Sequence, residues 1–353
     1  MDKQVIEPSN AQFTFKCSQL KAQNNIHECE SFHVTRRKRG RGFEYCLLDG
    51  AKISETNVLK RFKTLVIPPM WQEVRISLCE QSKVQAFGYD QRQRKQYIYH
   101  QQWEELRQAE KFARLAEFGK HLVDLRKAYV TDLERAQWDL QKTTALALLL
   151  LDRTGIRIGN KSYSTQNGTI GLTTLRRKHL EEDESELAFS FTGKHGKQRH
   201  IDISDPQAGK LISESASKPG YPLFRYRIGS HWEDLLSDDV NTRLRELLDF
   251  EASAKDFRTW TGTRLAMQYA HQASVEANSN KRRKFTACLV KLVAQDLGNT
   301  PAVCEKYYIH PKVLSHLQKQ YKKSGDCSAF ESSDNWLNTQ LSPCEKAVLK
   351  VIS

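Results

Sequence analysis

The sequence predicts an α+β protein, in which a small β-rich N-terminal domain precedes a mainly α-helical domain that holds a small antiparallel sheet. The period of the apolar residues indicates this order. Apolar and polar residues alternate in short runs up to residue 99 and again between residues 169 and 203. Beyond residue 103, apolar residues otherwise recur every three or four positions. The length of 353 residues fits about two domains, and a hydrophobic share of 39% is sufficient for their cores.

The N-terminal domain is expected over residues 31–104. Before it, residues 1–30 are rich in Gln, Asn and Ser and show no sustained period, which is typical of a loosely ordered leader. Alternating apolar residues predict strands at 43–47 and 74–78, and a further pair of strands within 84–99. These strands make the first domain β-rich.

The second domain is expected over residues 105–353, and it starts on a long helix. From Phe112 to Tyr129, apolar residues fall at three- and four-residue steps and form one stripe. A second helix over 133–152 is apolar almost all round towards its end, and Gly155 ends it. This second helix therefore belongs to a core.

The clear β segment of the second domain is expected at 169–203 only, where two strands flank a tight turn at 193–196. The remainder is predicted to be helical. Later helices are expected at 239–250, 254–276 and 284–297, and two more are opened by Thr300-Pro301 and by Ser342.

Basic residues outnumber acidic residues by 55 to 42, which gives a net charge of +13. Such a surplus indicates a polyanionic partner, and nucleic acid before an anionic membrane. The longest apolar run, at 145–151, is far shorter than the ~20 residues that span a bilayer. The N-terminus shows no apolar signal segment. We therefore expect no membrane association and a cytoplasmic location.

No metal and no small-molecule cofactor are expected. Eight cysteines are scattered without a C-x-x-C pair, which is typical of reduced thiols. His27, Cys29 and His33 are loosely clustered, but no fourth ligand has a suitable spacing for zinc. Neither the phosphate-binding loop G-x-x-x-x-G-K-[ST] nor the dinucleotide fingerprint G-x-G-x-x-G occurs.

Four residues stand in positions that favour phosphate chemistry, although each also has an ordinary structural explanation. Arg157 lies in a glycine-flanked apolar loop, where an arginine either caps helix carbonyls or presents donors to an anion. Lys194 lies between two glycines at the tip of the hairpin, where most lysines are simply solvated. Arg258 could pair with a carboxylate, and Tyr308 could be a packing residue.

Together, these four residues supply what a metal-free attack on a phosphodiester needs. Two arginines can neutralise the non-bridging oxygens as charge grows on the phosphorus. A tyrosine can be the covalent nucleophile, provided that neighbouring cations lower its pKa from ~10. A lysine can protonate the departing sugar oxygen as a general acid.

Several short motifs, in their order and spacing, resemble the type IB DNA topoisomerases of the small kind found in poxviruses and many bacteria. The resemblance runs from about residue 31 to the end of the chain. The motifs are Pro68-Pro69-Met70-Trp71, Gly88-Tyr89-Asp90, Arg94-Lys95-Gln96-Tyr97-Ile98-Tyr99, Gly155-Ile156-Arg157-Ile158-Gly159-Asn160, Thr169-Ile170-Gly171-Leu172-Thr173-Thr174-Leu175, Phe191-Thr192-Gly193-Lys194, Lys255-Asp256-Phe257-Arg258-Thr259, Gly298-Asn299-Thr300-Pro301 and Tyr308-Ile309-His310-Pro311.

The resemblance implies a catalytic set. Tyr308 matches the nucleophile that forms a 3′-phosphotyrosyl bond, Arg157 and Arg258 match the two oxyanion-stabilising arginines, and Lys194 matches the general acid. It also implies a nucleoid-associated monomer whose two domains clamp double-stranded DNA. Such an enzyme cuts one strand, lets the free end rotate and reseals it, without ATP or an obligatory metal.

Two further positions follow from the resemblance. Asn299, nine residues before Tyr308, stands where poxvirus members have histidine and bacterial members have asparagine. An asparagine donates a hydrogen bond but cannot be a cation. Lys255 resembles a secondary active-site position. Tyr307 is the local rival for the nucleophile, since on a helix it points about 100° away from its neighbour, and the following Ile309-His310-Pro311 favours Tyr308.

One strand motif of the first domain resembles positions at which the family approaches DNA. A period of two places Tyr97 and Tyr99 on one face and Gln96 on the other. Tyrosines that pack the domain's own sheet are the alternative. The basic run at 36–41 is either a phosphate-facing strip or a solvated face. The DNA-binding set expected from this motif is Arg94, Lys95, Gln96, Tyr97 and Tyr99.

Two other functions use the same residues. A tyrosine recombinase shares the Arg, Lys, Arg and Tyr chemistry, but recombinases usually have histidines where this chain has Lys255 and Asn299, and they need paired sites. A non-catalytic DNA-binding clamp would keep the fold and lose turnover. The presence of all four central residues favours an enzyme.

Overall fold

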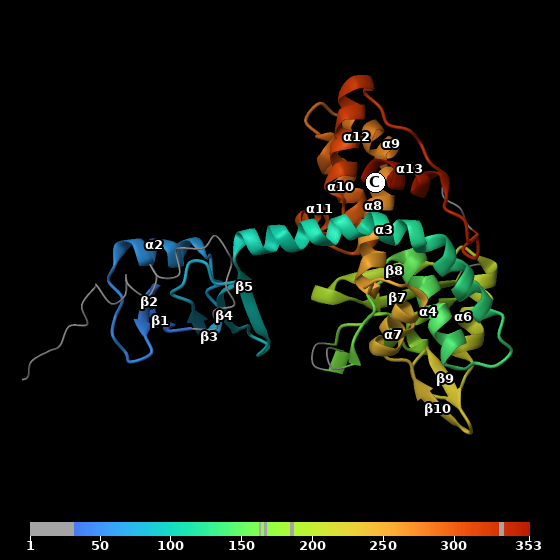
Figure 1. The fold of residues 1–353 in the computed structure, drawn as a ribbon, viewed down its shortest axis with the longest axis horizontal. Helices are drawn as coiled ribbons and strands as arrows, with labels where there is room; N and C mark the ends of the chain where they lie inside the picture. The colour runs from blue at the N-terminus through green and yellow to red at the C-terminus, as the bar shows by residue number, and fades with distance from the viewer. Residues whose placement is uncertain (1–31, 162–163, 166–167, 184–186, 332–334) are drawn as a thin grey trace, which may run out of the picture. The chain divides into compact units, whose positions relative to one another are not determined.

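The computed structural model describes residues 32–161, 164–165, 168–183, 187–331 and 335–353 (Figure 1). The leader expected at residues 1–30 lies outside the described residues, as do His27 and Cys29. The chain divides into two compact units between Glu110 and Lys111. This division falls inside the long helix α3 (Gln101–Leu133), and each unit is described by itself below.

The first unit is built on a five-stranded antiparallel sheet with the strand order β2-β1-β3-β4-β5. Its strands are β1 (Val34–Arg39), β2 (Gly42–Leu47), β3 (Gln72–Ile76), β4 (Val84–Tyr89) and β5 (Lys95–Tyr99). A separate core of buried apolar side chains belongs to this sheet and to helix α2 (Thr56–Thr64). Its members are Val34, Tyr45, Phe62, Ile67, Val74, Ile76 and Ala86.

Helix α2 is an element of the first unit that the sequence patterns did not indicate. Phe62 is its single fully buried residue and packs against Tyr45 of β2, with 5.1 Å between the ring centroids. Nine residues with one buried anchor are too few for a helical period to appear in the sequence. The prediction of a β-rich unit otherwise agrees with the sheet.

The second unit is mainly helical, and it also holds two small antiparallel sheets (Figure 1). Its helices after α3 are α4 (Leu140–Thr154), α6 (Pro206–Ala216), α7 (Ser237–Leu247), α8 (Ala254–Gln268), α9 (Ala270–Asn278), α10 (Phe285–Leu297), α11 (Pro301–Tyr307), α12 (Pro311–Ser324) and α13 (Pro343–Ile352). One sheet has three strands in the order β6-β7-β8, namely β6 (Leu180–Glu182), β7 (Leu187–Thr192) and β8 (Gln198–Asp202). The other is a hairpin of β9 (Arg225–Ile228) and β10 (His231–Asp234).

Several expected boundaries are wrong in this unit. The hairpin of β9 and β10 lies outside 169–203, which was expected to be the only β segment of this domain. The helix expected over 133–152 begins at Leu140 instead, because the Asp139 side chain accepts a hydrogen bond from the Lys142 main-chain N–H at 3.0 Å and caps it. The single helix expected over 254–276 is interrupted at Tyr269, between α8 and α9.

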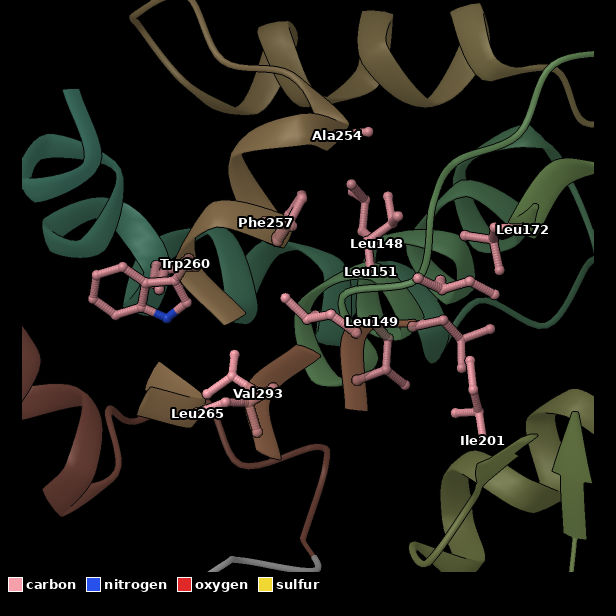
Figure 2. Packing of buried hydrophobic residues seen from close by; sticks show 14 of the residues in the cluster. Leu148, Leu149, Leu151, Leu172, Ile201, Ala254, Phe257, Trp260, Leu265 and Val293 are labelled. Carbon is pink, nitrogen blue, oxygen red and sulfur yellow. The ribbon is translucent and has the colours of Figure 1, made fainter. Parts of the chain in front are cut away.

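Helix α8 runs through the middle of the core of the second unit (Figure 2). Phe257 and Trp260 are completely buried on it, and both rings meet Phe118 of α3 edge to face. Gly119 of α3 leaves the space for the Trp260 ring, since a Cβ at this glycine would overlap the ring. Most of α8 is thus buried in this core, and the helix carries one of the predicted site arginines.

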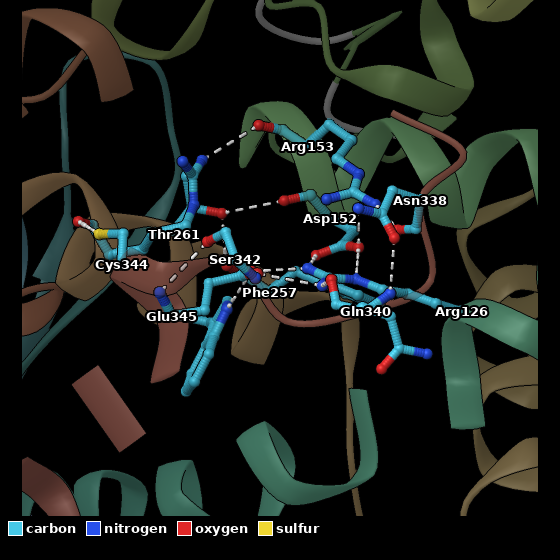
Figure 3. A network of polar contacts seen from close by, with 12 residues as sticks. Arg126, Asp152, Arg153, Phe257, Thr261, Asn338, Gln340, Ser342, Cys344 and Glu345 are labelled. Atoms are coloured by element: carbon cyan, nitrogen blue, oxygen red, sulfur yellow. Dashed lines mark hydrogen bonds and ion pairs between the residues drawn. The ribbon is translucent and has the colours of Figure 1, made fainter. Parts of the chain in front are cut away.

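A buried polar network joins four helices of the second unit (Figure 3). Arg126 of α3 donates from Nε to Asp152 of α4 at 2.8 Å and from Nη2 to Glu345 of α13 at 2.6 Å. The Tyr129 hydroxyl donates to Asp152 at 2.8 Å, and the Trp260 indole N–H donates to Glu345 at 3.2 Å. Charges this deeply buried are tolerated only when each is paired, so the network fixes α13 against α3, α4 and α8.

No helix in the described part of the chain is long and apolar enough to cross a bilayer. The same residues contain no group of three or more His, Cys, Asp and Glu side chains placed to hold a metal ion.

Candidate active site

Tyr308 lies where α11 ends, directly against helix α8. Its main-chain N–H donates to Cys304 O at 2.9 Å and closes the last turn of α11. Its carbonyl oxygen faces α8, where Thr263 Oγ1 lies 3.2 Å away and also accepts a hydrogen bond from the His310 main-chain N–H. Gly262 makes this approach possible, since a Cβ there would lie 2.7 Å from Tyr308 O.

Gly262 and Thr263 are site residues that the sequence analysis missed. The available signal was a glycine inside a predicted helix, which usually has a packing reason.

Arg258 lies on α8, almost completely buried beside Tyr308. Its guanidinium carbon is 5.0 Å from the centroid of the Tyr308 ring. Nη1 donates to Gly155 O at 2.6 Å, and Nη2 donates to Leu297 O. Burial and the nearby charge of Arg157 lower the pKa of Arg258 to about 10, which still leaves the group protonated at neutral pH.

The two carbonyls that receive Arg258 come from the ends of two helices. Helix α4 ends at Gly155 and α10 ends at Gly298, each in the left-handed conformation with φ near 60°. A helix C-terminus carries a partial negative charge that a cation stabilises. Arg258 therefore links both helix ends through main-chain oxygens instead of pairing with a carboxylate.

Arg157 lies in the loop directly after α4, as predicted, and is largely buried. Its main-chain oxygen accepts from Leu172 N at 2.8 Å, and the next carbonyl, of Ile158, accepts from Thr173 N at 2.8 Å. These two main-chain hydrogen bonds to the 169–175 motif fix the loop. The side chain donates from Nη2 to Oδ1 of Asn299. Burial lowers the pKa of Arg157, and the proximity of Tyr308 opposes this shift.

Asn299 occupies the turn between α10 and α11, with 6% of its surface exposed. Its main-chain N–H donates to Ala294 O at 2.9 Å, and its main-chain oxygen accepts from Lys197 Nζ. The amide oxygen of the side chain accepts from Arg157. The amide nitrogen Nδ2 is therefore oriented as a donor by the contact that its oxygen makes.

Two buried donors of this cluster are without a partner among the described residues: Arg258 Nε and Asn299 Nδ2. A buried donor left unpaired costs roughly 1–3 kcal/mol. Neither Arg157 nor Arg258 forms an ion pair within the described part of the chain. Two cationic side chains and two orphaned N–H donors beside one tyrosine fit an anion such as a phosphate group.

Lys194 and Lys255 are exposed and less closely connected to this cluster. Lys194 begins the short 3₁₀ turn Lys194–Gly196 between β7 and β8, where Gly196 has φ +73°. Lys255 lies in the first turn of α8, one turn before Arg258. No hydrogen bond within the described residues joins either lysine side chain to Arg157, Arg258, Asn299 or Tyr308.

Lys111 of α3 is a further cation at the site, and the sequence analysis missed it. Its Nζ donates to the main-chain oxygen of Tyr307 and lies 5.8 Å from the centroid of the Tyr308 ring. Burial lowers the pKa of Lys111 to about 8, and the charge of Asp256 opposes this shift. The contact joins residues 196 positions apart in the chain, so no local pattern could indicate it.

The expected DNA-binding residues of the first unit fall into two groups in the structure, one stacked along the strand and one bonded to Asp90. Tyr97 and Tyr99 stack with 5.9 Å between their centroids, and 44% of the Tyr97 surface is exposed. Lys95 Nζ lies 5.4 Å from the Tyr97 centroid. In contrast, Arg94 and Gln96 both bind Asp90, at 2.8 and 3.0 Å.

The basic run at 36–41 is also divided. Arg36 is directed inwards, and its guanidinium donates to the main-chain oxygens of Ile67, Pro68 and Trp71. It thereby fixes the loop that precedes β3. The other basic residues of the run, Arg37, Lys38, Arg39 and Arg41, are all exposed, so within this run these are the ones that can face a phosphate backbone.

Comparisons with known proteins agree in both units. Residues 100–329 match the family described as eukaryotic DNA topoisomerase I, catalytic core. Residues 42–90 match the family described as bacterial DNA topoisomerase IB, N-terminal domain.

Individual relatives extend this similarity. The chain is 30% identical to the DNA topoisomerase 1B of Acanthamoeba polyphaga mimivirus over 285 residues, which cover 78% of this chain and 84% of the relative. It is 24% identical to the DNA topoisomerase 1B of Vaccinia virus (strain Copenhagen) over 64% of this chain and 70% of the relative. The DNA topoisomerase 1 of Schizosaccharomyces pombe is 26% identical over 43% of this chain, but over only 18% of its own length.

Proposed function

The chain belongs to the type IB DNA topoisomerase family, and from this premise we propose that it relaxes supercoiled double-stranded DNA through a covalent 3′-phosphotyrosyl intermediate on Tyr308. One strand is cut, the free end rotates, and the strand is rejoined. The observation that carries the proposal is that Arg157 and Arg258 lie beside Tyr308, with Asn299 bonded to Arg157 and two buried donors left unpaired among the described residues.

In the cleavage step, the phenolic oxygen of Tyr308 forms a bond to phosphorus and releases its proton to solvent. The bond from phosphorus to the 5′-oxygen breaks, and Lys194 gives that oxygen a proton. Rejoining is the reverse, in which the 5′-hydroxyl attacks and the tyrosyl ester is released. A general acid contributes typically ~10²–10⁴-fold to such a step.

The unpaired donors define where the phosphate binds. Arg258 Nε and Asn299 Nδ2 are already desolvated and oriented, so they lose little when negative charge develops on the non-bridging oxygens. The Arg157 guanidinium, held by Asn299, supplies the second positive charge. Lys255, one turn before Arg258 on α8, is placed to add a secondary contact with DNA.

Neither ATP nor an obligatory metal enters this scheme. The tyrosyl ester keeps the energy of the phosphodiester that it replaces, so rejoining is nearly isoenergetic. Torsional strain in the DNA drives the rotation. We further propose that the enzyme acts as a monomer, and that Tyr97, Tyr99 and Lys95 of the first unit contact the duplex.

The test is relaxation of supercoiled plasmid in EDTA and without ATP, with Tyr308→Phe as the key variant and Tyr307→Phe as its matched control. We expect wild type and Tyr307→Phe to relax both positive and negative supercoils, and Tyr308→Phe to bind DNA without relaxing it. Only the two active proteins should form a covalent adduct with DNA.

Other outcomes would contradict the proposal. If Tyr308→Phe relaxes DNA and Tyr307→Phe does not, the neighbouring tyrosine is the nucleophile. If wild type binds DNA but never relaxes it, the chain is a non-catalytic clamp or a recombinase restricted to its own sites.

A further inference from the structure

The hairpin that carries Lys194 contains a second lysine, and this one is anchored. Lys197 directly precedes β8, and its Nζ donates to the main-chain oxygen of Asn299. The Lys194 side chain is exposed and makes no hydrogen bond or ion pair within the described residues. Two lysines three positions apart therefore differ: one is free at the tip, and the other is fixed to the segment that holds the candidate phosphate ligand Asn299.

A neighbouring arginine strengthens this attachment. Arg199 of β8 is buried, and its Nη1 donates to Gln295 O at 3.3 Å. Its side chain covers Gly298, where an added Cβ would overlap it. Lys197 and Arg199 thus hold the same turn, one at each side of Gly298-Asn299.

The anchored end of the hairpin is connected directly to the turn that contains Lys194. Gly193 N donates to Lys197 O at 2.8 Å, and Gly196 N donates to Gly193 O at 3.1 Å. Lys194 is one of the residues of this hydrogen-bonded turn. Because Lys197 closes this turn and is itself bound to Asn299, the turn has little freedom to move, although the glycines themselves permit many conformations.

We propose that Lys197 is a positioning residue for the general acid: by binding the Asn299 carbonyl, it ties the Lys194 hairpin to the phosphate-binding segment, so that both approach the scissile phosphate together. The inference rests on the proposed function, in which Lys194 protonates the 5′-oxygen. Holding a catalytic group in place removes an entropic part of the barrier, and a displacement of about 1 Å can cost on the order of 100-fold.

Among the described residues, the Lys197 side chain forms one hydrogen bond to the cluster, and its acceptor is a neutral main-chain oxygen. A direct action on the phosphate would instead require its ammonium to leave this carbonyl. The two possibilities predict different effects on the cleavage rate when the leaving group is changed, and the experiment uses this difference.

The experiment measures single-turnover cleavage of a duplex at a site first mapped with wild type, on two substrates. One has the ordinary 5′-oxygen at the scissile bond, and the other has sulfur there, which leaves as a thiolate and needs little protonation. The proteins are wild type, Lys194→Met, Lys197→Met, the double variant and Lys197→Arg. Lys210→Met, which removes one exposed charge on α6, is the control for net charge.

On the oxygen substrate, we expect Lys197→Met to be slower by on the order of 10- to 100-fold, and Lys197→Arg to retain most of the rate because it keeps a donor. On the sulfur substrate, Lys197→Met should approach wild type. The double variant should be no slower than Lys194→Met alone, since a positioning residue has no effect once its acid is absent. Lys210→Met should match wild type on both substrates.

The proposal is overturned if Lys197→Met is equally slow on both substrates, because Lys197 then acts on the phosphate or on folding. It is also overturned if Lys197→Met cleaves the oxygen substrate at the wild-type rate. The cleavage rate of Lys194→Met on the sulfur substrate tests the general-acid assignment itself. If Lys194→Met is not rescued, the general-acid assignment of the proposed function fails and takes this inference with it. If it is rescued and Lys197→Met is not, only the inference fails.

Discussion

Arg258 and Tyr308 are held together through main-chain contacts, with the guanidinium carbon 5.0 Å from the centroid of the tyrosine ring. The arginine donates to carbonyls at the ends of α4 and α10, and the tyrosine backbone lies against Gly262 one turn further along α8. The cation and the nucleophile are therefore positioned by the same helix. Rotation of the Arg258 side chain away from Tyr308 would break its hydrogen bonds to the ends of α4 and α10.

This arrangement predicts that Arg258→Lys does not substitute for arginine. A lysine ammonium donates from a single nitrogen, so it cannot reproduce the planar fork in which Nη1 binds Gly155 O, Nη2 binds Leu297 O and Nε presents a third donor. We expect single-turnover cleavage to fall by roughly 10²–10³-fold, as for other oriented donors to a developing oxyanion. Arg264→Lys, on the same helix, is the control and should retain its cleavage rate. A rate for Arg258→Lys within a factor of three of wild type would contradict this function of the guanidinium.

Asn299 makes a second prediction, because only one of its two amide atoms is engaged. Its oxygen accepts from Arg157, and its nitrogen is unpaired. Asn299→Ala removes the donor, whereas Asn299→Asp also places a negative charge where the phosphate is expected. We therefore expect Asp to slow cleavage more than Ala, and His to retain activity because its ring N–H can donate. Equal rates for the Ala and Asp variants would show that no anion approaches this position.

Local sequence patterns could indicate the residues of the candidate site. Tyr308, Arg157, Arg258 and Asn299 each lie in a short motif, and the structure brings these four together. Glycines at the ends of α4 and α10 also gave correct helix ends. These features depend on neighbours along the chain, which a sequence displays directly.

Contacts between distant segments could not be predicted in this way. Lys111 reaches Tyr307 across 196 positions and Lys197 reaches Asn299 across 102, and neither pair is related by any period. The hairpin of β9 and β10 was missed because each strand has only four residues, at least half of which are charged or polar. Helix α6 was not predicted, although the sequence carries a signal for it, since Asp205 caps it and Pro206 opens it.

Lys111 predicts an unusual combination of stability and activity. Burial lowers its pKa to about 8, below the ordinary value of ~10.4, so the charged form is disfavoured in the folded protein. Since the unfolded chain binds more protons between these two values, the free energy of unfolding should rise as the pH increases through this window. Lys111→Met removes the burial cost and should raise the melting temperature at pH 7.

The same substitution should slow cleavage. The Lys111 ammonium lies 5.8 Å from the Tyr308 ring, so it can stabilise negative charge that develops near the phenolic oxygen during the reaction. Between pH 6 and 10, the wild-type rate should lose this assistance above about pH 8, and the Lys111→Met profile should lack that inflection. Matching profiles for the two proteins would exclude an electrostatic effect on the nucleophile.

The buried network predicts how the second unit responds to acid. Burial alone would raise the pKa of Asp152 and of Glu345, but Arg126 outweighs it and lowers both. Groups with a lowered pKa in the folded state contribute stability above their unfolded values, near 4, and this stability is lost as the pH falls through their folded values. Arg126→Met should therefore destabilise the protein by roughly 3–5 kcal/mol at pH 8, because it removes the hydrogen-bonded cation from two buried carboxylates and leaves Asp152 only the longer ion pair with Arg153, at 3.9 Å.

Comparison of two pH values separates this electrostatic cost from a simple loss of packing. In Arg126→Met the two buried carboxylates should have raised pKa values because they have lost Arg126, so lowering the pH from 8 to 5 should neutralise them and narrow the difference in melting temperature from wild type. Lys127→Met is the matched control, since Lys127 is the next residue on α3 and forms an exposed pair with Asp124 at 3.1 Å. It should change stability by less than about 1 kcal/mol at either pH. A deficit for Arg126→Met that stays constant from pH 8 to pH 5 would show that the helices are held by packing around α13 and not by this charge network.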